Sequence, residues 1–287
     1  MTRIAVVTGA NQGLGFALVR GLAARLAPED LVLLTGRDAG RVAAAAADVA
    51  ADPATRSRVE GRVLDVSDFA AVARFAVPAD IVISNAVGPL DPGRPQAEQA
   101  DVFLDVANGG THAVLRSFGP VLRPGGRLLV VASSLGTLGH LPEPLRPRFD
   151  GVSLDEVEKA VEDWRAAIHD GTAPAAGWPE WINVPSKVAQ VAAVRAVAAE
   201  RRDRDLADGT LVAAVCPGLV DTRASRPWFS DFSQARTPDE AARAVLDQVF
   251  AEVDPATYGE LVRFGRVLPW RSGSPVHSTQ NSLPSGS

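Results

Sequence analysis

Short apolar runs alternate with segments of helical periodicity along most of this 287-residue chain. The first run, Ile4–Val7, is continuously apolar, whereas a strand with one wet face would alternate apolar and polar residues. Continuous runs separated by helices predict a doubly wound, Rossmann-type α/β fold with a parallel sheet, whose ligand lies at the carboxyl ends of the strands. The expected strands are 4–7, 31–34, 59–64, 81–84, 127–132, 211–215 and 260–264. The expected helices are 14–26, 41–51, 68–75, 97–118, 187–200 and 239–252.

Two stretches interrupt this alternation. Residues 138–179 hold several prolines, an amphipathic helix near residues 154–168 and a run of Gly, Ala and Pro. This stretch is too long for a simple connection between two elements. We expect a helical insertion there, beside the ligand site. Residues 272–287 are rich in Ser, Gly and Pro without apolar periodicity, so we expect a disordered tail after a single domain that spans residues 1–271.

Charge and residue counts exclude several kinds of function. The net charge is −5 and no basic tract is present, which disfavours a nucleic acid or an anionic membrane as partner. One cysteine, Cys216, excludes an internal disulfide and a cysteine metal cluster, and the four histidines show no metal-ligand spacing. No apolar stretch is long enough to span a membrane. We therefore expect a cytoplasmic protein with no metal site and a small-molecule ligand.

A glycine-rich turn follows the first expected strand. The segment from Thr8 to Gly15 leads directly into the first helix. Glycines there allow a sharp turn and a close approach to a pyrophosphate, which lies where the free N–H groups of the helix N-terminus face it. Three glycines alone also fit an ordinary tight turn, but their place at the start of a βαβ unit favours a dinucleotide site. The expected contacts are Gly9, Asn11, Gln12, Gly13, Leu14 and Gly15.

The end of the second expected strand indicates which dinucleotide binds. An acidic residue at this tip would bond the adenosine ribose and favour NAD, whereas Arg37 suits the 2′-phosphate of NADP(H), the expected cofactor. The alternative is a solvated surface arginine, which is common in this chain. Asp65 and Val66, after the third strand, are expected near the adenine ring. Asn85 and Ala86, after the fourth, are expected beside the adenosine ribose.

These motifs together resemble the short-chain dehydrogenase/reductase family over nearly the whole chain, to about Trp270. The glycine segment is similar to the family's TGxxxGxG motif, and residues 84–87 are similar to a degraded NNAG motif. The family's remaining cofactor loop is matched by Pro217, Gly218, Val220 and Thr222. The resemblance therefore implies binding of a nicotinamide dinucleotide.

Within the family, the chain most resembles the monomeric carbonyl reductases. Its long insertion ends in Gly177-Trp178-Pro179, just before the helix of Lys187. Lys187 follows Ser134 by 53 positions, far more than in most members of the family. In the carbonyl reductases such an insertion covers the helices through which other members pair. The resemblance therefore implies a monomer, with quinones and polycyclic aromatic ketones as substrate class.

The resemblance also implies a set of catalytic residues. In the family a nicotinamide hydride attacks a carbonyl carbon while a tyrosine gives a proton to the oxygen. Ser134 would hydrogen-bond that oxygen, Lys187 would bind the nicotinamide ribose, and Asn108 would order a water. The tyrosine belongs four residues before the lysine, where this chain has Asn183. Because Lys159 and Lys187 are the two lysines of the chain, the retention of Lys187 argues that the ribose contact is kept.

Five other residues were candidates for a role at this site. Tyr258, the sole tyrosine, matches no catalytic position of the family. His140 is either a surface residue of a loop or a substitute acid, and His112 is either packed or solvated. Trp178 and Trp181 form an aromatic wall for a flat substrate, or else they anchor the insertion.

An asparagine amide donates a hydrogen bond but does not release a proton near neutral pH. Hydride addition to a simple ketone makes a strongly basic alkoxide, whereas a quinone yields a phenolate, whose conjugate acid has a pKa of about 10. The missing acid therefore favours a quinone or polycyclic aromatic carbonyl as substrate, with Ser134 and Asn183 as an oxyanion pair. Two alternatives remain open: a non-redox enzyme such as a cyclase or dehydratase, and a catalytically silent NADP-binding protein.

Overall fold

The structure is a computed structural model that describes residues 2–274. Residues 275–287, most of the expected tail, lie outside the described residues. The sheet has the order β3-β2-β1-β4-β5-β6-β7-β8, and its strands are parallel except for β8, which pairs antiparallel with β7. The strands are β1 (Ile4–Val7), β2 (Leu31–Gly36), β3 (Arg58–Val63), β4 (Ala79–Ser84), β5 (Leu122–Val131), β6 (Leu211–Val215), β7 (Leu261–Arg263) and β8 (Arg266–Leu268).

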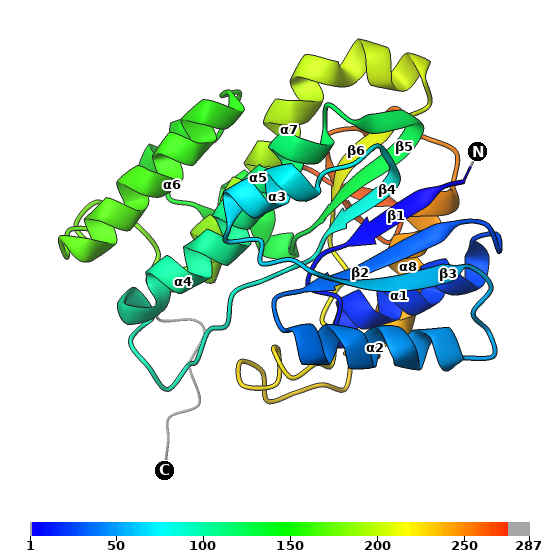
Figure 1. The fold of residues 1–287 in the computed structure, drawn as a ribbon. Coiled ribbons are helices and arrows are strands. Elements are labelled where there is room, and N and C mark those ends of the chain that lie inside the picture. Colours follow the sequence, from blue (N-terminus) through cyan, green and yellow to red (C-terminus); the bar gives the residue numbers. More distant parts are fainter. Residues whose placement is uncertain (1, 275–287) are drawn as a thin grey trace.

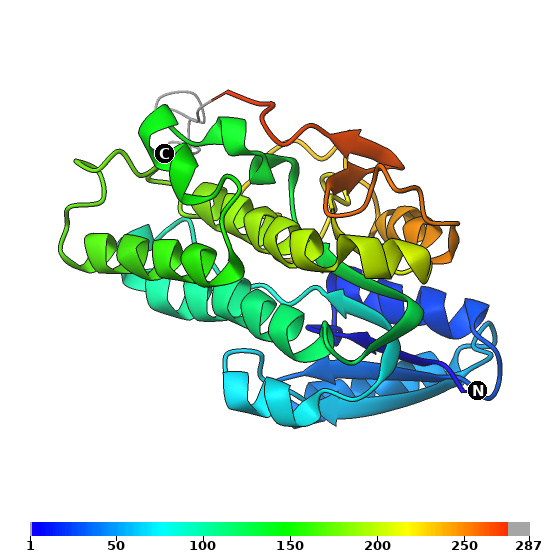
Figure 2. The same ribbon diagram turned by 90° about the horizontal axis from the view of Figure 1, so that it is seen from above.

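Helices cover both faces of this sheet (Figure 1; Figure 2). One face carries α1 (Gly13–Arg25), α2 (Ala39–Ala51) and α8 (Pro238–Phe250). The other carries α3 (Phe69–Phe75), α4 (Ala100–Leu104), α5 (Gly110–Phe118) and α7 (Asn183–Ala207), with α6 (Leu154–His169) packed outside them. The predicted Rossmann-type fold is therefore confirmed. The short strand β8 was missed, because three residues carry too little periodicity to be recognised.

The strand order reverses between β1 and β4, and this decides where a ligand can lie. From β1 the chain proceeds to β2 and β3 on one side, and from β4 it proceeds toward β8 on the other. The loops after β1 and β4 therefore diverge and leave a crevice at the carboxyl ends of the strands. Ala5, Val6 and Val7 of β1 are fully buried, which explains why this strand is apolar at every position.

The expected helix 97–118 is not uniform. It consists of a 3-10 turn (Gln96–Gln99), α4, a π-helical turn (Asp105–Gly109) and α5. The backbone N–H of Gly110 bonds to the carbonyl of Asp105, the wide spacing that defines a π turn. Neighbouring side chains leave no room for a Cβ here: one at Gly109 would lie 2.4 Å from Cζ of Phe69. The π turn holds Asn108, which is fully buried.

The expected insertion, residues 138–179, holds two 3-10 turns followed by α6. The turns are Leu138–His140 and Glu143–Arg148, and a third turn, Ser134–Gly136, precedes the insertion. A capping box between Ser153 and Glu156 starts α6. The insertion is held by aromatic packing and ion pairs: Trp164 of α6 stacks on Trp178 with ring centroids 5.3 Å apart, and Arg165 pairs with Asp105 at 2.7 Å. The insertion therefore lies over α4, α5 and α7.

Candidate active site

The glycine loop after β1 is fastened to the loop after β4. Gly9 has φ +61°, and a Cβ there would lie 2.7 Å from Cα of Ala86. The backbone N–H groups of Asn85 and Ala86 both donate to Oγ1 of Thr8, at 2.9 and 3.1 Å. The Asn85 side chain in turn donates to the carbonyls of Thr8 and Gly9. The Asn85 amide thus holds the loop in shape, a role that the sequence analysis did not assign to it.

The N-terminus of α1 is suited to an anion. Its N-cap residue, Gln12, makes no capping bond with its side chain, and no acidic residue lies in the first turn. The N–H groups of this turn therefore keep the positive end of the helix dipole without compensation. Gly13, with φ +57°, faces Thr222: a Cβ there would lie 3.6 Å from Cγ2 of Thr222. A Cβ at Gly15 would lie 2.5 Å from Nδ2 of Asn85, so the loop closes because that residue is glycine.

The polar residues after β2 have different roles. The carboxylate of Asp38 accepts the backbone N–H of Arg41 at 2.9 Å and so caps α2. Arg37 is exposed, and no ion pair of its guanidinium occurs among residues 2–274. Asn11 lies against Gly36, where a Cβ would be 3.0 Å from Oδ1. This tip therefore presents a free cation rather than a free carboxylate, which fits a phosphate.

The expected adenine-side residues lie at the end of β3. Asp65 accepts the N–H and the hydroxyl of Ser67, at 3.0 and 2.6 Å, in a tight turn. Val66 packs against α5, where a Cβ at Gly110 would lie 2.7 Å from Cγ2 of Val66. Val66 is 5% exposed, so it offers a small apolar edge.

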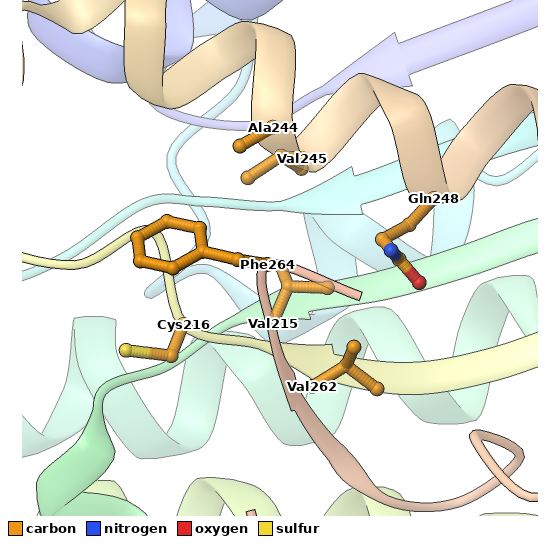
Figure 3. A pocket seen from close by; sticks show the side chains of 7 residues that line it. All are labelled: Val215, Cys216, Ala244, Val245, Gln248, Val262 and Phe264. Carbon is orange, nitrogen blue, oxygen red and sulfur yellow. The ribbon is translucent and has the colours of Figure 1, made fainter. Parts of the chain in front are cut away.

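The loop after β6 closes the other side of the crevice. Gly218 has φ +81°, and a Cβ there would lie 3.0 Å from Cζ of Phe264. Figure 3 shows the Phe264 ring between Cys216 of this loop and Ala244 and Val245 of α8. The cavity at this joint measures about 10 Å³, room for about one water and too small for a substrate.

The same loop is stabilised by its own hydrogen bonds. Val220 forms a bridge with Arg236, and the backbone N–H of Thr222 donates to Oγ of Ser225 at 3.0 Å. Val220 is 8% exposed, so its side chain has little surface to offer a ligand. The expected contacts Pro217, Gly218 and Thr222 lie on the same short loop as Val220, and Thr222 reaches the glycine loop.

The catalytic candidates come from three elements that meet around one turn of α7. The 3-10 turn that begins at Ser134 follows β5 and packs on α7: a Cβ at Gly136 would lie 2.9 Å from the carbonyl oxygen of Lys187. The side chain of Asn108, in the π turn, donates to the carbonyl of Ser186 at 3.1 Å and accepts the Ser186 hydroxyl at 2.7 Å. Ser134, Lys187 and Asn108 are therefore gathered in one region.

Lys187 is the one buried lysine of this region, and it is 9% exposed. Burial lowers its pKa from the ordinary 10.5 to about 8, while the Cys216 thiol acts in the opposite direction. Its Nζ donates to Oε1 of Gln190 at 2.8 Å. Gln190 was not among the expected site residues, although a glutamine within the apolar stretch that follows Lys187 was a visible signal.

Asn183 is the first residue of α7 and lies one helical turn before Lys187. It is half-buried, and its side chain makes no hydrogen bond to another described residue. Tyr258 is no substitute for a tyrosine at 183. Its hydroxyl donates to Asp205, which lies 22 residues further along α7, about 33 Å away at 1.5 Å per residue.

Comparisons with known proteins agree with this arrangement. No protein-family model matches the chain. The carbonyl reductase [NADPH] 3 of Rattus norvegicus is 29% identical over 284 residues, which cover 94% of this chain and 99% of the relative. Among solved structures, salutaridine reductase from Papaver somniferum shares the fold with a TM-score of 0.74, at 21% identity and over 90% of this chain and 99% of that one. The chain is therefore similar in sequence to carbonyl reductases and shares its fold with a solved plant reductase.

A second solved structure shares the fold of this chain. It is the NADPH-bound short-chain oxidoreductase of Pseudomonas aeruginosa PAO1, described as containing an atypical catalytic center. Its TM-score is 0.61 at 21% identity, over 91% of this chain and 94% of that one. In this chain the departure from the family motif is Asn183 in place of the tyrosine.

Two tryptophans near this turn of α7 have different packing partners. Trp178 is 6% exposed and packs between Trp164 and Phe149, so it anchors the insertion. Trp181 is half-buried and stacks on Trp228 of the loop after β6, with centroids 6.0 Å apart. The buried Nε1 of Trp181 finds no hydrogen-bond partner among the described residues. Trp178 therefore anchors the insertion, whereas a ligand-facing role for Trp181 stays a prediction.

His140 and His112 both make structural contacts in the described part of the chain. Thr137 donates its hydroxyl proton to the carbonyl of Ser272, so His140 Nδ1 must donate to Thr137 Oγ1, at 2.8 Å. Burial lowers the pKa of His140. His140 thus joins the insertion to the C-terminal segment, whereas His112 is buried between α5 and α6. Within residues 2–274 there is no group of three or more metal-ligating side chains, and no helix is long and apolar enough to cross a membrane.

Proposed function

We propose that this NADPH-dependent carbonyl reductase acts on a quinone or a polycyclic aromatic ketone, and that it works without a tyrosine general acid. The observation that carries the proposal is Asn183 at the tyrosine's place on α7, while Ser134, Lys187 and Asn108 are all retained. A site that had lost its function would not be expected to keep a buried lysine, which costs desolvation energy.

The cofactor is NADP(H). The dinucleotide would lie across the crevice between the loops after β1 and β4, with its pyrophosphate at the N-terminus of α1. Arg37 would bind the 2′-phosphate, because its guanidinium is exposed and unpaired in the described chain while Asp38 is engaged with Arg41. Lys187 would donate hydrogen bonds to the nicotinamide ribose. Among its relatives, the carbonyl reductases of rat and pig carry NADPH in their names.

The residues around the carbonyl oxygen stabilise charge rather than transfer a proton. NADPH, when bound, would supply a hydride, and its two electrons would reduce the conjugated quinone system to the aromatic phenolate level. The Ser134 hydroxyl and the Asn183 amide would each donate a hydrogen bond to the oxygen as its negative charge grows. Neither group releases a proton near neutral pH. A phenolate, whose conjugate acid has a pKa of about 10, can leave as the anion and take its proton from water.

An aromatic wall supports the same substrate class. Trp181 lies two residues before Asn183 and is stacked on Trp228, so the pair presents indole surface next to the catalytic turn. A planar polycyclic ring gains most from such a surface, because offset stacking needs an extended π face.

The test is NADPH consumption, followed by its absorbance, with a naphthoquinone, an anthraquinone and cyclohexanone in parallel. We expect turnover of the quinones, with cyclohexanone slower by about 10²–10⁴-fold because its alkoxide needs the missing acid. An enzyme-free sample and the Lys187→Met variant control for direct chemical reduction. Tight NADPH binding without oxidation by any of the three would refute the proposal and favour a non-redox enzyme or an NADP-binding protein without catalysis.

A further inference from the structure

A buried amide lies next to the catalytic lysine and is not part of the family's catalytic set. Gln190 follows Lys187 by three residues on the same face of α7 and is 1% exposed. Burying an amide costs free energy unless its polar atoms are hydrogen-bonded. Gln190 makes three bonds: Nε2 donates to the carbonyl of Ala107 at 2.7 Å and to Oγ1 of Thr111 at 2.9 Å, and Oε1 accepts Nζ of Lys187 at 2.8 Å.

The orientation of this amide is locked. Thr111 Oγ1 donates its own proton to the carbonyl of Ala107 at 2.7 Å, so toward Gln190 it can only accept. Both N–H bonds of Gln190 are thus aimed at acceptors. A flipped amide would place Oε1 against the Ala107 carbonyl and an N–H against the ammonium of Lys187, with loss of all three bonds. Oε1 must therefore face Lys187.

We propose that Gln190 is a positioning residue for Lys187, whose amide oxygen holds the ammonium in place for the nicotinamide ribose. This proposal rests on the proposed function, since the ribose belongs to NADPH. Nζ has three N–H donors, and the contact with Gln190 takes one and leaves two for ribose hydroxyls. A neutral acceptor suits this role, because a carboxylate would compete for the ammonium as an ion pair and an apolar side chain would leave a buried charge without a partner.

The other side chains described around Lys187 do not accept a hydrogen bond from its ammonium group. Across the sheet-facing side of α7, the Cys216 thiol at the end of β6 is the titratable group that acts on Lys187 among the described residues. The side chains that the π turn and α5 direct to this part of α7, Asn108 and Thr111, are neutral, and Asn108 is engaged with Ser186. Gln190 is therefore the polar side chain that bonds the ammonium directly.

The scarcity of lysine allows a direct test without turnover. Labelling with ¹³Cε-lysine gives one signal each for Lys159 and Lys187, and the exposed Lys159 on α6, paired with Asp163, serves as internal reference. In the intact chain without NADPH, we expect the Lys187 signal to titrate with a pKa of about 8. Gln190→Leu should lower this midpoint by about 1 pH unit, because an acceptor of the charged form is lost. Gln190→Glu should raise it by about 1 unit or more, because a carboxylate stabilises the charge.

Control variants separate this role from ordinary packing. Gln99→Leu removes another buried glutamine, whose side chain makes four hydrogen bonds in a different loop, and should lower stability without moving the Lys187 midpoint. A Cys216→Ala background removes the thiol from the titration. If Gln190→Leu does not fold, Gln190→Glu and Thr111→Val, which loosens one anchor of the amide, decide the question. Lys187 midpoints within 0.2 units or so of the parent in the folded variants would overturn the proposal.

A binding measurement distinguishes this proposal from the proposed function. NADPH affinity, followed by its fluorescence, should fall about 10-fold in Gln190→Leu, because a hydrogen bond to a charged group is lost from the ribose site. Failure of the parent chain to bind NADPH would overturn the proposed function, while the NMR titration would still decide whether Gln190 holds Lys187. Normal NADPH binding with unmoved midpoints would overturn the role of Gln190 alone.

Discussion

Asn183 and Lys187 share one face of α7, and the difference between their side chains decides what the site can do. The lysine is buried and donates to a neutral amide, whereas the asparagine is half-buried with its amide free of described partners. At pH 7 a lysine with a pKa of about 8 remains mostly protonated and donates to acceptors. Charge stabilisation is therefore available at this turn, and proton release from residue 183 is not.

Asn183→Tyr tests whether proton supply is the missing function. Tyrosine there would restore the family's acid, so reduction of cyclohexanone should rise by about 10²–10⁴-fold, measured as kcat/KM. Asn183→Ala is the matched variant: it should lower quinone reduction by about 10²-fold, the usual effect of removing one oxyanion donor. Unchanged ketone reduction in a folded, NADPH-binding Asn183→Tyr protein would contradict the assignment of position 183.

Arg37→Asp tests the choice of cofactor at the tip of β2. The change removes the cation that would bind the 2′-phosphate and introduces a carboxylate that can accept ribose hydroxyls. The preference for NADPH over NADH should fall by about 100-fold or more, given loss of a charge-assisted pair worth about 1.5–3 kcal/mol plus repulsion of the phosphate. Arg74→Asp on α3, another exposed arginine, should leave the preference unchanged. An unchanged preference for NADPH in Arg37→Asp would mean that another group binds the 2′-phosphate.

At the scale of elements, the segment between α6 and α7 holds two tryptophans with different packing partners. Trp178 is buried between two aromatic rings, while Trp181, three residues later, stacks with Trp228 and keeps an unpaired N–H. Both residues lie in the short segment between α6 and α7, so sequence position cannot separate them. The residues that each tryptophan contacts on other elements distinguish the two.

Trp178→Ala and Trp181→Ala form a matched pair of equal chemical size. Truncation of the buried Trp178 should lower the free energy of unfolding by about 3–5 kcal/mol, as for other large aromatic side chains in cores. Truncation of Trp181 should cost less stability and raise KM for an anthraquinone, with kcat for a small quinone changed little. Denaturant unfolding and steady-state kinetics check both. Equal effects of the two variants on KM would contradict this division.

At the scale of the whole molecule, we expect stability to depend on pH through His112, which is buried where α6 meets α5. His112 is 4% exposed, its Nε2 lacks a hydrogen-bond partner in the described chain, and burial lowers its pKa from 6.5 to about 4. Above pH 6.5 the histidine is neutral in both the folded and the unfolded chain. Between pH 6.5 and 4, His112 binds a proton in the unfolded chain but not in the folded chain. The free energy of unfolding therefore falls as the pH falls.

The loss should approach about 3 kcal/mol by pH 4, at 1.36 kcal/mol for each unit of pKa difference. His112→Gln removes the titrating group and should flatten this part of the curve, although other acidic groups will add their own slope. His169→Gln, at an exposed histidine on α6, is the control. Urea unfolding at several pH values between 7 and 4 measures the effect. Parallel curves for the parent and His112→Gln would contradict it.

The same packing bears on assembly. The insertion ties α6 to α5 through the pair Arg116–Glu158, at 2.8 Å, and to the π turn through Arg165–Asp105. We propose that α6 occupies the helical surface through which many short-chain reductases pair, so the chain should remain a monomer. Light scattering after gel filtration, at concentrations up to the highest attainable, should give the mass of one chain. A dimer mass would contradict this proposal.

The sequence by itself determined the architecture and the positions of the cofactor motifs. Apolar periodicity and glycine spacing are properties of residues that are neighbours in the sequence. A strand that is buried on both faces is recognised because its residues are apolar without interruption. For this reason the strands from β1 to β7, the glycine loop and the replacement at Asn183 could be located without a structure. The family resemblance then supplied the expected roles of Ser134, Lys187 and Asn108.

The tertiary structure alone decided which side chains far apart in the sequence contact one another and what those contacts hold in place. Asn85 closes the glycine loop 76 residues away, and Gln190 is locked by Ala107 and Thr111 from another helix. Phe69 of α3 packs so closely on the π turn around Asn108 that Gly109 has no room for a side chain. Such outcomes depend on which distant groups come into contact, and a hydrogen bond or a close approach exists only once the fold has brought both partners together.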